Sequence, residues 1–560
     1  MKRIRVEDLT LREKIGQTAC LRATAVKITG DADVFAYFKS NPYGSIWTSG
    51  FAKMDFVNMS GEWKDSSDVD YDMDKRIRSF INAVNGVLQV PILSAADAEY
   101  GARRIFPYLS ETLTSPAIAA TGDPEVAFRL GKHIGAEMRL AKTRWAWCDV
   151  ADNASPFNAV MATRCFSSDV ALSGRMVAEY AKGFQASGVA ATLKHSPGAD
   201  RDEYRDSHFS DQAITQTKDE WWERQGCIFK AGIDAGAYSV MLSHCAFPAV
   251  DGELIHGKPT PAPMSYPIVT GLLKNEMGFD GVVITDAVAM RAVTGIYPTR
   301  KEMYVKMYNA GVDMILGPTE HDYIDIIEGA VKEGLIQESR IDDACERVLV
   351  MKEKLGLFDE PEEERLPVDD SVRADTVGQT RAYIEKIAPK AITWVCKRDN
   401  GLLPLDPARI KSVHIFYFGY SEVARNDLSV VVEEFEKRGV RVTVSDRIEN
   451  GRVLYEVARE NDLILYFLHL AGHSPFGGLS FYGEKALNFL NVLLYGGEKS
   501  IGVSIGSQFV YHAWMPSADR FINLYSSQPE LLKALVAGLW GECEFTGGFP
   551  YDPNPLAKRL

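Results

Sequence analysis

The chain has 560 residues, of which 46% are hydrophobic and 25% charged, and its formal net charge is -14 at pH 7. This length exceeds a single hydrophobic core and predicts two domains, and the composition is that of an ordinary globular protein. The negative charge repels phosphate backbones and anionic lipid, so we expect neither nucleic acid nor a membrane as a partner.

The N-terminal sequence and the cysteines indicate the compartment in which the protein works. The N-terminal stretch MKRIRVEDLTLREKIGQ has basic residues but no apolar core behind them, unlike a signal peptide. Charges interrupt every apolar run before it reaches membrane-spanning length. The eight cysteines are scattered without a CxxC pair, which favours buried thiols over a disulfide framework or metal ligands. We therefore predict a soluble, cytoplasmic protein without a bound metal.

Short apolar runs alternate with amphipathic helical stretches over the first two thirds of the chain. Eight runs begin near residues 17, 44, 91, 145, 188, 237, 281 and 311, and helices are predicted over 124–142, 173–188 and 267–279. Such alternation implies parallel strands covered on both faces, and eight units suggest a (β/α)₈ TIM-type barrel. A doubly wound open sheet would give a similar pattern, so the periodicity alone leaves closure open.

A second alternation follows the barrel. A predicted helix over 341–359 ends the first region, and the charged, proline-containing stretch after it is typical of a linker. Five more apolar runs begin near residues 412, 441, 462, 499 and 520, with helices between them. We predict a barrel over 1–358, a linker over 359–378 and an αβα sandwich domain over 379–560. The polar stretch 51–76 is expected to be a surface loop.

Polar side chains follow most of the predicted barrel strands, where a barrel places its functional groups. One acidic residue at such a position is equally well explained as a cap of the next helix. The whole set is better explained as a polar pocket that faces a polyol. Its members are Asp97, Glu99, Asp149, Asp152, Lys194, His195, His244 and Asp286.

The segment GFDGVVITDAVAM delivers Asp286 to the barrel mouth and resembles the nucleophile motif of glycoside hydrolase family 3. Other segments resemble the family's motifs in the same order over nearly the whole chain. They are PILSAADAEYG for its DxEGG segment, MATRCFSSD for its sugar-contacting arginine strand, AATLKHSPG for KHFPG, RDSH for the acid/base loop, IDDACERVLVMKEKLGLFD for the closing helix and DNGLLPL for the start of the second domain.

The resemblance implies a retaining mechanism in which Asp286 attacks the anomeric carbon. Asp206-Ser207-His208 resembles the branch of the family that contains β-N-acetylglucosaminidases, where a His–Asp dyad replaces the usual glutamate. There His208 would be the acid/base, because an imidazole can give a proton to the leaving oxygen and later take one from water. Asp206 would orient its ring. Without the resemblance, the polar loop would be interpreted as a solvated charge run.

The same resemblance implies that Asp97, Arg164, Lys194 and His195 hold the hydroxyls of the bound sugar. The alternative is that these residues have a structural role and form salt bridges within the barrel, for example Arg164 with Asp152. His244 is expected only to hydrogen-bond the backbone.

Three departures from the family pattern leave the specificity for N-acetylglucosamine open. Ala199 replaces the family's second histidine, and the spacing from Lys194 to the DSH tripeptide is one residue longer. Tyr100 stands where a small residue is expected, and its ring could narrow the pocket.

Glu484 of the second domain is a rival acid/base, as in other branches of the family, although a helix N-terminus also favours glutamate.

We predict a retaining exo-β-glycosidase for terminal β-linked sugars, with β-N-acetylhexosaminides as the leading substrates and a glycosyl-Asp286 intermediate. A β-glucosidase or β-xylosidase, a β-N-acetylglucosaminide phosphorylase and a catalytically silent sugar-binding protein stay open as alternatives. The expected partner is a carbohydrate, and a homodimer is compatible with the sequence. No cofactor is implied, because both half-reactions need only side chains and water.

Overall fold

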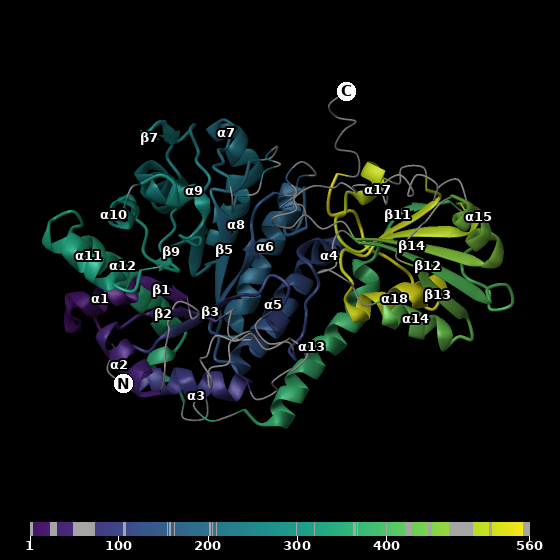
Figure 1. Cartoon of the computed structure of the whole chain (residues 1–560), viewed down its shortest axis with the longest axis horizontal. Coiled ribbons are helices and arrows are strands. Elements are labelled where there is room, and N and C mark those ends of the chain that lie inside the picture. The colour runs from purple at the N-terminus through teal and green to yellow at the C-terminus, as the bar shows by residue number, and fades with distance from the viewer. Residues whose placement is uncertain are drawn as a thin grey trace.

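The protein has a large barrel and a smaller layered domain side by side along its long axis (Figure 1). The computed structural model describes residues 4–22, 31–48, 73–104, 108–153, 155, 158, 160–161, 163–200, 203, 205, 207–208, 210–297, 299–318, 320–361, 366, 368–398, 400–419, 428–445, 451–469, 497–514 and 518–552. Most of the stretch 51–76, predicted to be a surface loop, lies outside these residues. No helix of the described residues is long and apolar enough to cross a membrane.

The barrel contains the eight strands that the sequence predicts, all of them parallel. In sheet order β10-β1-β2-β3-β4-β5-β6-β9, its strands are β1 (Ala19–Arg22), β2 (Ser45–Trp47), β3 (Leu93–Asp97), β4 (Trp145–Val150), β5 (Ala190–Ser196), β6 (Ser239–Leu242), β9 (Val282–Thr285) and β10 (Ile315–Leu316). A parallel bridge between Ile284 and Met314 joins the two ends of this sheet. The sheet therefore closes into a barrel rather than an open doubly wound layer.

Helices surround the barrel, and several begin at the caps that their sequences provide. The Asp123 side chain accepts a hydrogen bond from the backbone N–H of Glu125, 3.1 Å away, at the start of α5. The barrel's α-helices, with the two π-helices η5 and η7, are α1 (Leu11–Gln17), α2 (Asp31–Ser40), α3 (Met73–Asn85), α4 (Ser115–Ala120), α5 (Pro124–Leu140), α6 (Val170–Ala186), α7 (Lys218–Trp221), η5 (Trp222–Gly226), α8 (Cys227–Asp234), η7 (Pro267–Glu276), α9 (Arg291–Thr294), α10 (Arg300–Ala310), α11 (Tyr323–Lys332) and α12 (Glu338–Lys354). A small hairpin of β7 (Leu254–Ile255) and β8 (Lys258–Pro259) lies after β6.

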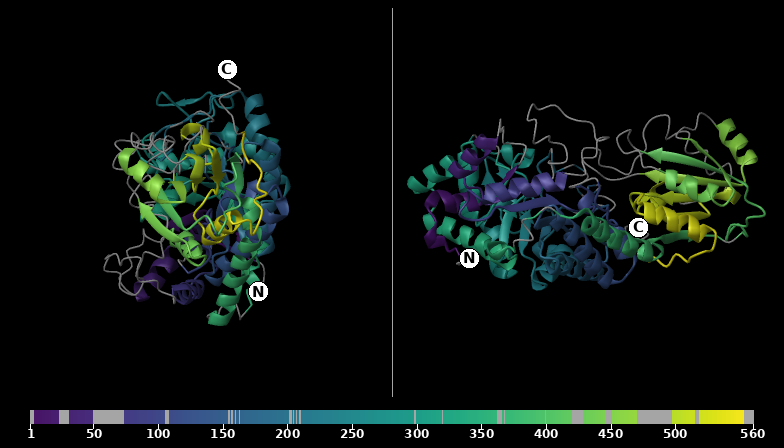
Figure 2. Two further views of the ribbon diagram at one scale, coloured as in Figure 1. Left: turned by 90° about the vertical axis from the view of Figure 1, so that its right-hand side faces the viewer. Right: turned by 90° about the horizontal axis from the view of Figure 1, so that it is seen from below.

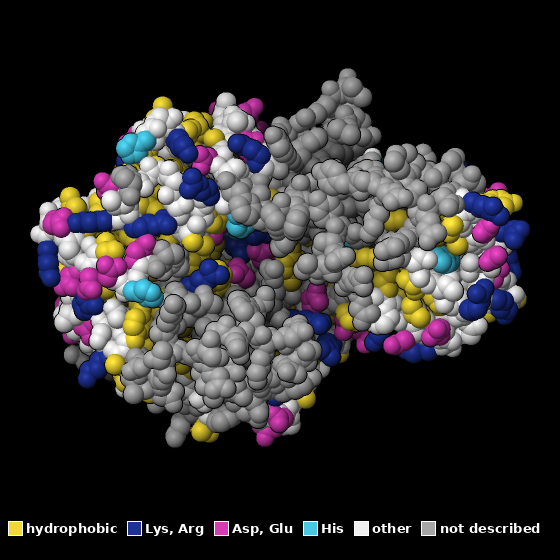
Figure 3. Space-filling model, viewed as in Figure 1, with side chains coloured by type: hydrophobic (Ala, Val, Ile, Leu, Met, Phe, Trp, Pro, Cys, Tyr) yellow, Lys and Arg dark blue, Asp and Glu magenta, His cyan; other side chains and the backbone are white. Residues whose placement is uncertain are grey.

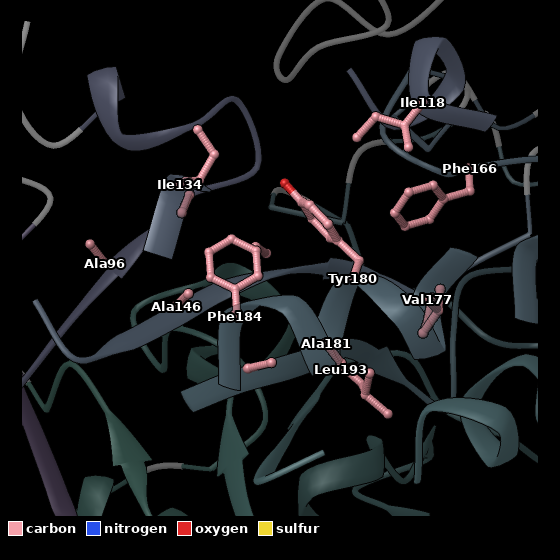
Figure 4. Close-up of a cluster of buried hydrophobic side chains, with 14 of the residues drawn as sticks. Ala96, Ile118, Ile134, Ala146, Phe166, Val177, Tyr180, Ala181, Phe184 and Leu193 are labelled. Carbon is pink, nitrogen blue, oxygen red and sulfur yellow. The ribbon is translucent and has the colours of Figure 1, made fainter. Parts of the chain in front are cut away.

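The core between the barrel and its helices combines aliphatic side chains with a few aromatic rings and is tightly packed. Figure 4 shows Tyr180 and Phe184 of α6 beside Ile134 of α5, and the two rings meet edge to face at 5.0 Å. Helices α5 and α6 approach closely because Gly183 has no side chain. A Cβ atom there would lie 2.1 Å from the carbonyl oxygen of Phe128.

The second domain is a sheet with helices packed on it. In sheet order β11-β16-β15-β14-β12-β13, its strands are β11 (Thr393–Lys397), β12 (Ser412–Gly419), β13 (Arg441–Ser445), β14 (Leu463–His469), β15 (Ser500–Ser504) and β16 (Arg520–Asn523). Its helices are α13 (Asp370–Ala391), α14 (Ser429–Glu436), α15 (Gly451–Glu460), α17 (Val510–Trp514) and α18 (Pro529–Leu539). The five predicted strands are confirmed, and the antiparallel edge strand β11 was not predicted.

Helix α13 and the C-terminal segment connect the two domains. Helix α13 packs against α5 of the barrel and against α18 of the second domain, as Figure 2 shows. Its first turns occupy residues of the predicted linker, so that part of the linker is helical; the domain limits stay a prediction. Further along, the backbone N–H of Gly548 bonds the carbonyl of Ala120 at 2.7 Å, and that of Asp552 bonds the Ser168 hydroxyl at 2.7 Å.

Candidate active site

A cavity of about 400 Å³ opens at the carboxyl ends of the barrel strands. Figure 3 shows acidic, basic and histidine side chains in the hollow on this face. The cavity is lined by six of the seven residues predicted for the site, namely Asp97, Arg164, Lys194, His195, His208 and Asp286. The seventh, Asp206, lies outside the described residues, as does the rival Glu484.

Asp286 follows β9 directly and is held by the backbone of the neighbouring strand. Its N–H donates to the carbonyl of Leu242 on β6 at 2.9 Å, and its carboxylate accepts the N–H of Ala287 at 2.7 Å. Burial alone would raise the pKa of this carboxyl. In the acidic range where it titrates, the positive charges of His195 and His244 outweigh burial and hold its pKa below the usual value. Asp286 is therefore ionised at neutral pH.

Glu99 joins two cations of the pocket. Arg164 binds it with two nitrogens, at 2.9 and 2.7 Å, and the Lys194 ammonium lies 2.6 Å from it. Burial would raise the pKa of Glu99, but Arg164 and Lys194 hold it well below its usual range. Lys194 also contacts Asp97, at 3.2 Å. Arg164 and Lys194 thus form salt bridges within the barrel, as the alternative to sugar binding predicted. The suggested partner was wrong, because among the described contacts Arg164 pairs with Glu99 and not with Asp152.

His208 lies on the loop that follows β5. His208 is exposed to solvent and lines the cavity. Its backbone carbonyl accepts a hydrogen bond from the N–H of Arg291 at 3.3 Å, which ties the loop to α9. The buried Asp200 anchors the start of the same loop, because its carboxylate accepts both the N–H and the hydroxyl of Thr215, at 2.6 and 2.7 Å. The pairing of His208 with Asp206 stays a prediction.

His244 makes the backbone hydrogen bond that was predicted, and it also lies beside the nucleophile candidate. Its Nε2 donates to the carbonyl of Ala287 at 3.0 Å, and its Nδ1 is buried with no partner among the described residues. Burial lowers the pKa of this imidazole. A neutral ring therefore fixes the peptide that follows Asp286.

The apolar part of the cavity was not predicted from the sequence. Trp47 and Trp147 contact each other there, with ring centroids 5.6 Å apart. Their signal was available, because alternate residues of a barrel strand point inward and both tryptophans end up on that face. Tyr100 is not among the described residues that line the cavity, whereas Ala199 is. The further apolar lining residues are Val160, Met161, Met241, Met290 and Leu316.

A metal site needs several histidine, cysteine or acidic side chains close together. The part of the chain that the structure describes contains no group of three histidine, cysteine or acidic side chains that could hold a metal ion. The carboxylates of the pocket are instead bonded to Arg164, Lys194, His195 and backbone N–H groups.

Comparison with known proteins gives matches over the whole chain. The family model "Glycosyl hydrolase family 3 N terminal domain" matches residues 10–351. A β-N-acetylglucosaminidase/β-glucosidase of Cellulomonas fimi is 29% identical over 492 residues, which cover 84% of this chain and 85% of that protein. β-Hexosaminidase A of Pseudoalteromonas piscicida is 28% identical over 360 residues, covering 58% of this chain and 56% of that protein.

Solved structures share the two-domain fold. A β-glucoside phosphorylase bound to 2FGlc superposes with a TM-score of 0.82 at 23% identity, covering 98% of this chain and 95% of that one. A β-N-acetylglucosaminidase from Paenibacillus sp. superposes with a TM-score of 0.77 at 24% identity, covering 97% and 99%. At these identities the likeness concerns the fold.

Proposed function

The chain belongs to glycoside hydrolase family 3, and from this premise we propose that it is a retaining exo-β-glycosidase whose leading substrates are terminal β-N-acetylhexosaminides. The observation that carries the proposal is the carboxylate of Asp286, which is partly buried and ionised at neutral pH, in a cavity of about 400 Å³. Such a carboxylate can attack an anomeric carbon and later be released from the glycosyl ester. A cavity of this size is at the small end of ligand sites, which suits one terminal sugar.

Two proton transfers complete the proposed reaction. In the first half-reaction Asp286 forms the glycosyl ester while His208 gives its proton to the leaving oxygen. In the second, His208 takes a proton from water, which attacks the ester and releases the sugar with its configuration retained. Asp206 would orient the His208 ring and stabilise its protonated form. The exposed position of His208 at the cavity wall supports this role, because solvent and leaving group can both reach it.

The polar residues that line the cavity would hold the sugar hydroxyls. Glu99 keeps Arg164 and Lys194 in fixed positions, while Asp97, whose side chain is 29% exposed, remains open to the cavity. The Cellulomonas fimi relative carries both an N-acetylglucosaminidase and a β-glucosidase name, which supports a pocket for either sugar.

The substrate is tested with p-nitrophenyl β-N-acetylglucosaminide against the β-glucoside, β-galactoside and β-xyloside, with and without phosphate. We expect the N-acetyl sugar to be preferred and phosphate to have no effect on the rate. Preference for a plain glycoside would make the enzyme a β-glucosidase or β-xylosidase. Formation of sugar 1-phosphate at a rate that rises with phosphate would make it a phosphorylase.

The nucleophile is tested with Asp286→Ala and with a 2-deoxy-2-fluoro glycoside that traps the glycosyl ester. We expect kcat to fall on the order of 10⁴-fold, and mass spectrometry to find the trapped sugar on the Asp286 peptide. Asp280→Ala is the matched control, because this exposed carboxylate precedes the same strand at its other end. Wild-type activity in Asp286→Ala, or a label on another residue, contradicts the assignment.

A further inference from the structure

A further carboxylate of the pocket, Asp152, has no role in the reaction described above. Its side chain is 1% exposed. One oxygen lies 3.2 Å from the backbone nitrogen of His195 and 3.3 Å from its Nδ1. The other accepts the backbone N–H of Ala199 at 2.8 Å and the Gln225 amide at 2.9 Å. Two of these four partners are backbone N–H groups, one on each oxygen, and these can only donate, so an ionised carboxylate suits this position and an amide does not.

Gln225 reaches Asp152 because of an irregularity in its helix. The wider η5 turn (Trp222–Gly226) is inserted between α7 and α8, and such insertions re-aim side chains, often at functional sites. The turn after β5 leaves room for the amide, since a Cβ atom on Gly198 would lie 1.5 Å from the Gln225 nitrogen. Gly198 has a φ of 115°, which favours glycine as well.

The two neighbours of His195 together select one tautomer of its ring. On the far side of the ring, Nε2 lies 3.3 Å from a nitrogen of Arg164. A guanidinium only donates hydrogen bonds, so Nε2 must be the unprotonated, accepting nitrogen. Nδ1 then carries the proton and donates it to Asp152. The opposite tautomer would set a lone pair against the carboxylate and an N–H against Arg164.

We propose that Asp152 is a positioning residue of the glycosidase: together with Gln225 it holds His195 in the Nδ1–H tautomer, so that Nε2 meets the sugar as a hydrogen-bond acceptor. The inference rests on the proposed function, because it concerns the sugar that the cavity binds. In the complex a sugar hydroxyl can replace the Arg164 N–H, 3.3 Å away, as the donor to that lone pair. The hydroxyl that meets His195 must therefore donate, which a fluorine or hydrogen at the same carbon cannot do.

Asp152→Asn tests the proposal because it keeps the shape and removes the charge. Its NH₂ group must face either the His195 pair or the Ala199 N–H, which are donors themselves. We expect kcat/KM on the preferred p-nitrophenyl glycoside to fall about 10²-fold, mainly through KM, because the contact exists in the ground state. In ¹⁵N spectra of histidine-labelled protein, assigned with His195→Gln, the Nδ1–H signature of His195 should be lost.

Asn153→Ala is the matched control. Asn153 is the next residue and donates to the carbonyl of Arg224 at 3.0 Å, so it joins the same loop to the same helix without touching His195. We expect its kcat/KM and ¹⁵N spectrum to match the wild type. If Asp152→Asn does not fold, Gln225→Ala removes one donor and leaves the carboxylate, and a KM rise of about fivefold is expected instead.

The outcomes separate this inference from the proposed function. A wild-type enzyme without turnover of any glycoside in the panel overturns the proposed function itself. An active wild type with an Asp152→Asn variant that keeps the Nδ1–H signature, or loses no more activity than Asn153→Ala, overturns the positioning role alone. An unchanged KM in Gln225→Ala does the same when Asp152→Asn cannot be purified folded.

Discussion

Replacing Glu99 by glutamine should destabilise the barrel more than any other conservative change in the pocket. The side chain of Glu99 is 8% exposed and that of Lys194 is 2% exposed, so both charges are nearly dry. Removing one partner of a buried ion pair costs about 3–5 kcal/mol, because the remaining charge is left uncompensated. Lys194 keeps Asp97 at 3.2 Å, so we expect the low end, a loss of about 3 kcal/mol in the free energy of unfolding.

The pH dependence of this loss has a definite sign. The pKa of Glu99 lies well below the usual value of a glutamate, because Arg164 and Lys194 outweigh burial. A depressed pKa contributes stability that is fully present above the unfolded-state pKa and is lost as pH falls toward the folded-state pKa. The difference between wild type and Glu99→Gln should therefore be constant above about pH 5 and shrink in more acidic buffer.

Urea denaturation followed by tryptophan fluorescence measures this difference, because Trp145 and Trp147 are buried inside the barrel. Asp97→Asn is the comparison variant: it contacts the same Lys194, but its side chain is 29% exposed, so we expect a loss below about 1 kcal/mol. Equal stabilities of Glu99→Gln and wild type at pH 7, or a difference that does not shrink in acid, would refute the reasoning.

Three further changes test the packing and the buried charges. Gly183→Ala sets a Cβ atom 2.1 Å from the carbonyl oxygen of Phe128, so it should lower the free energy of unfolding by about 1–3 kcal/mol, and an unchanged urea midpoint would contradict this. Burial raises the pKa of Asp149 well above its usual value, and no described residue bonds its carboxyl oxygens; Asp149→Asn should be more stable than wild type at pH 7, with a gain that vanishes toward pH 4 in the same denaturation series. Burial lowers the pKa of Lys352 to about 7, so the unfolded chain binds more protons above that pH. Wild-type stability should then rise between pH 7 and 10, and Lys352→Met should flatten that rise; parallel profiles would show that Lys352 is not its source.

The strands, the helices and the position of Asp286 could be predicted because they depend on local sequence. An apolar run of strand length followed by a charged residue is a property of a few neighbouring positions, and all eight barrel runs became strands. The short strand β11 follows α13 after a single residue, without a turn signal, and this is why the sequence did not predict it.

The partners inside the site could not be predicted in the same way. From the sequence, Asp152 was the suggested partner of Arg164. The guanidinium instead pairs with Glu99, 65 residues away, because the tertiary structure decides which carboxylate faces it across the barrel. Gln225 is 73 residues from Asp152 and reaches it only through an irregular helical turn. The local sequence around these residues therefore indicates neither the Arg164–Glu99 pair nor the Gln225–Asp152 contact.

The sequence by itself determined the alternation of strands and helices, the charged strand ends and the segment that presents Asp286. Hydrophobic periodicity determines these features, since each residue's face follows from its neighbours. Only the tertiary structure decided that the strands close into a barrel, that Glu99 bridges Arg164 and Lys194, and that Asp152 holds His195. These depend on distances and directions between side chains that are far apart in the chain, and such geometry exists only once the barrel has closed.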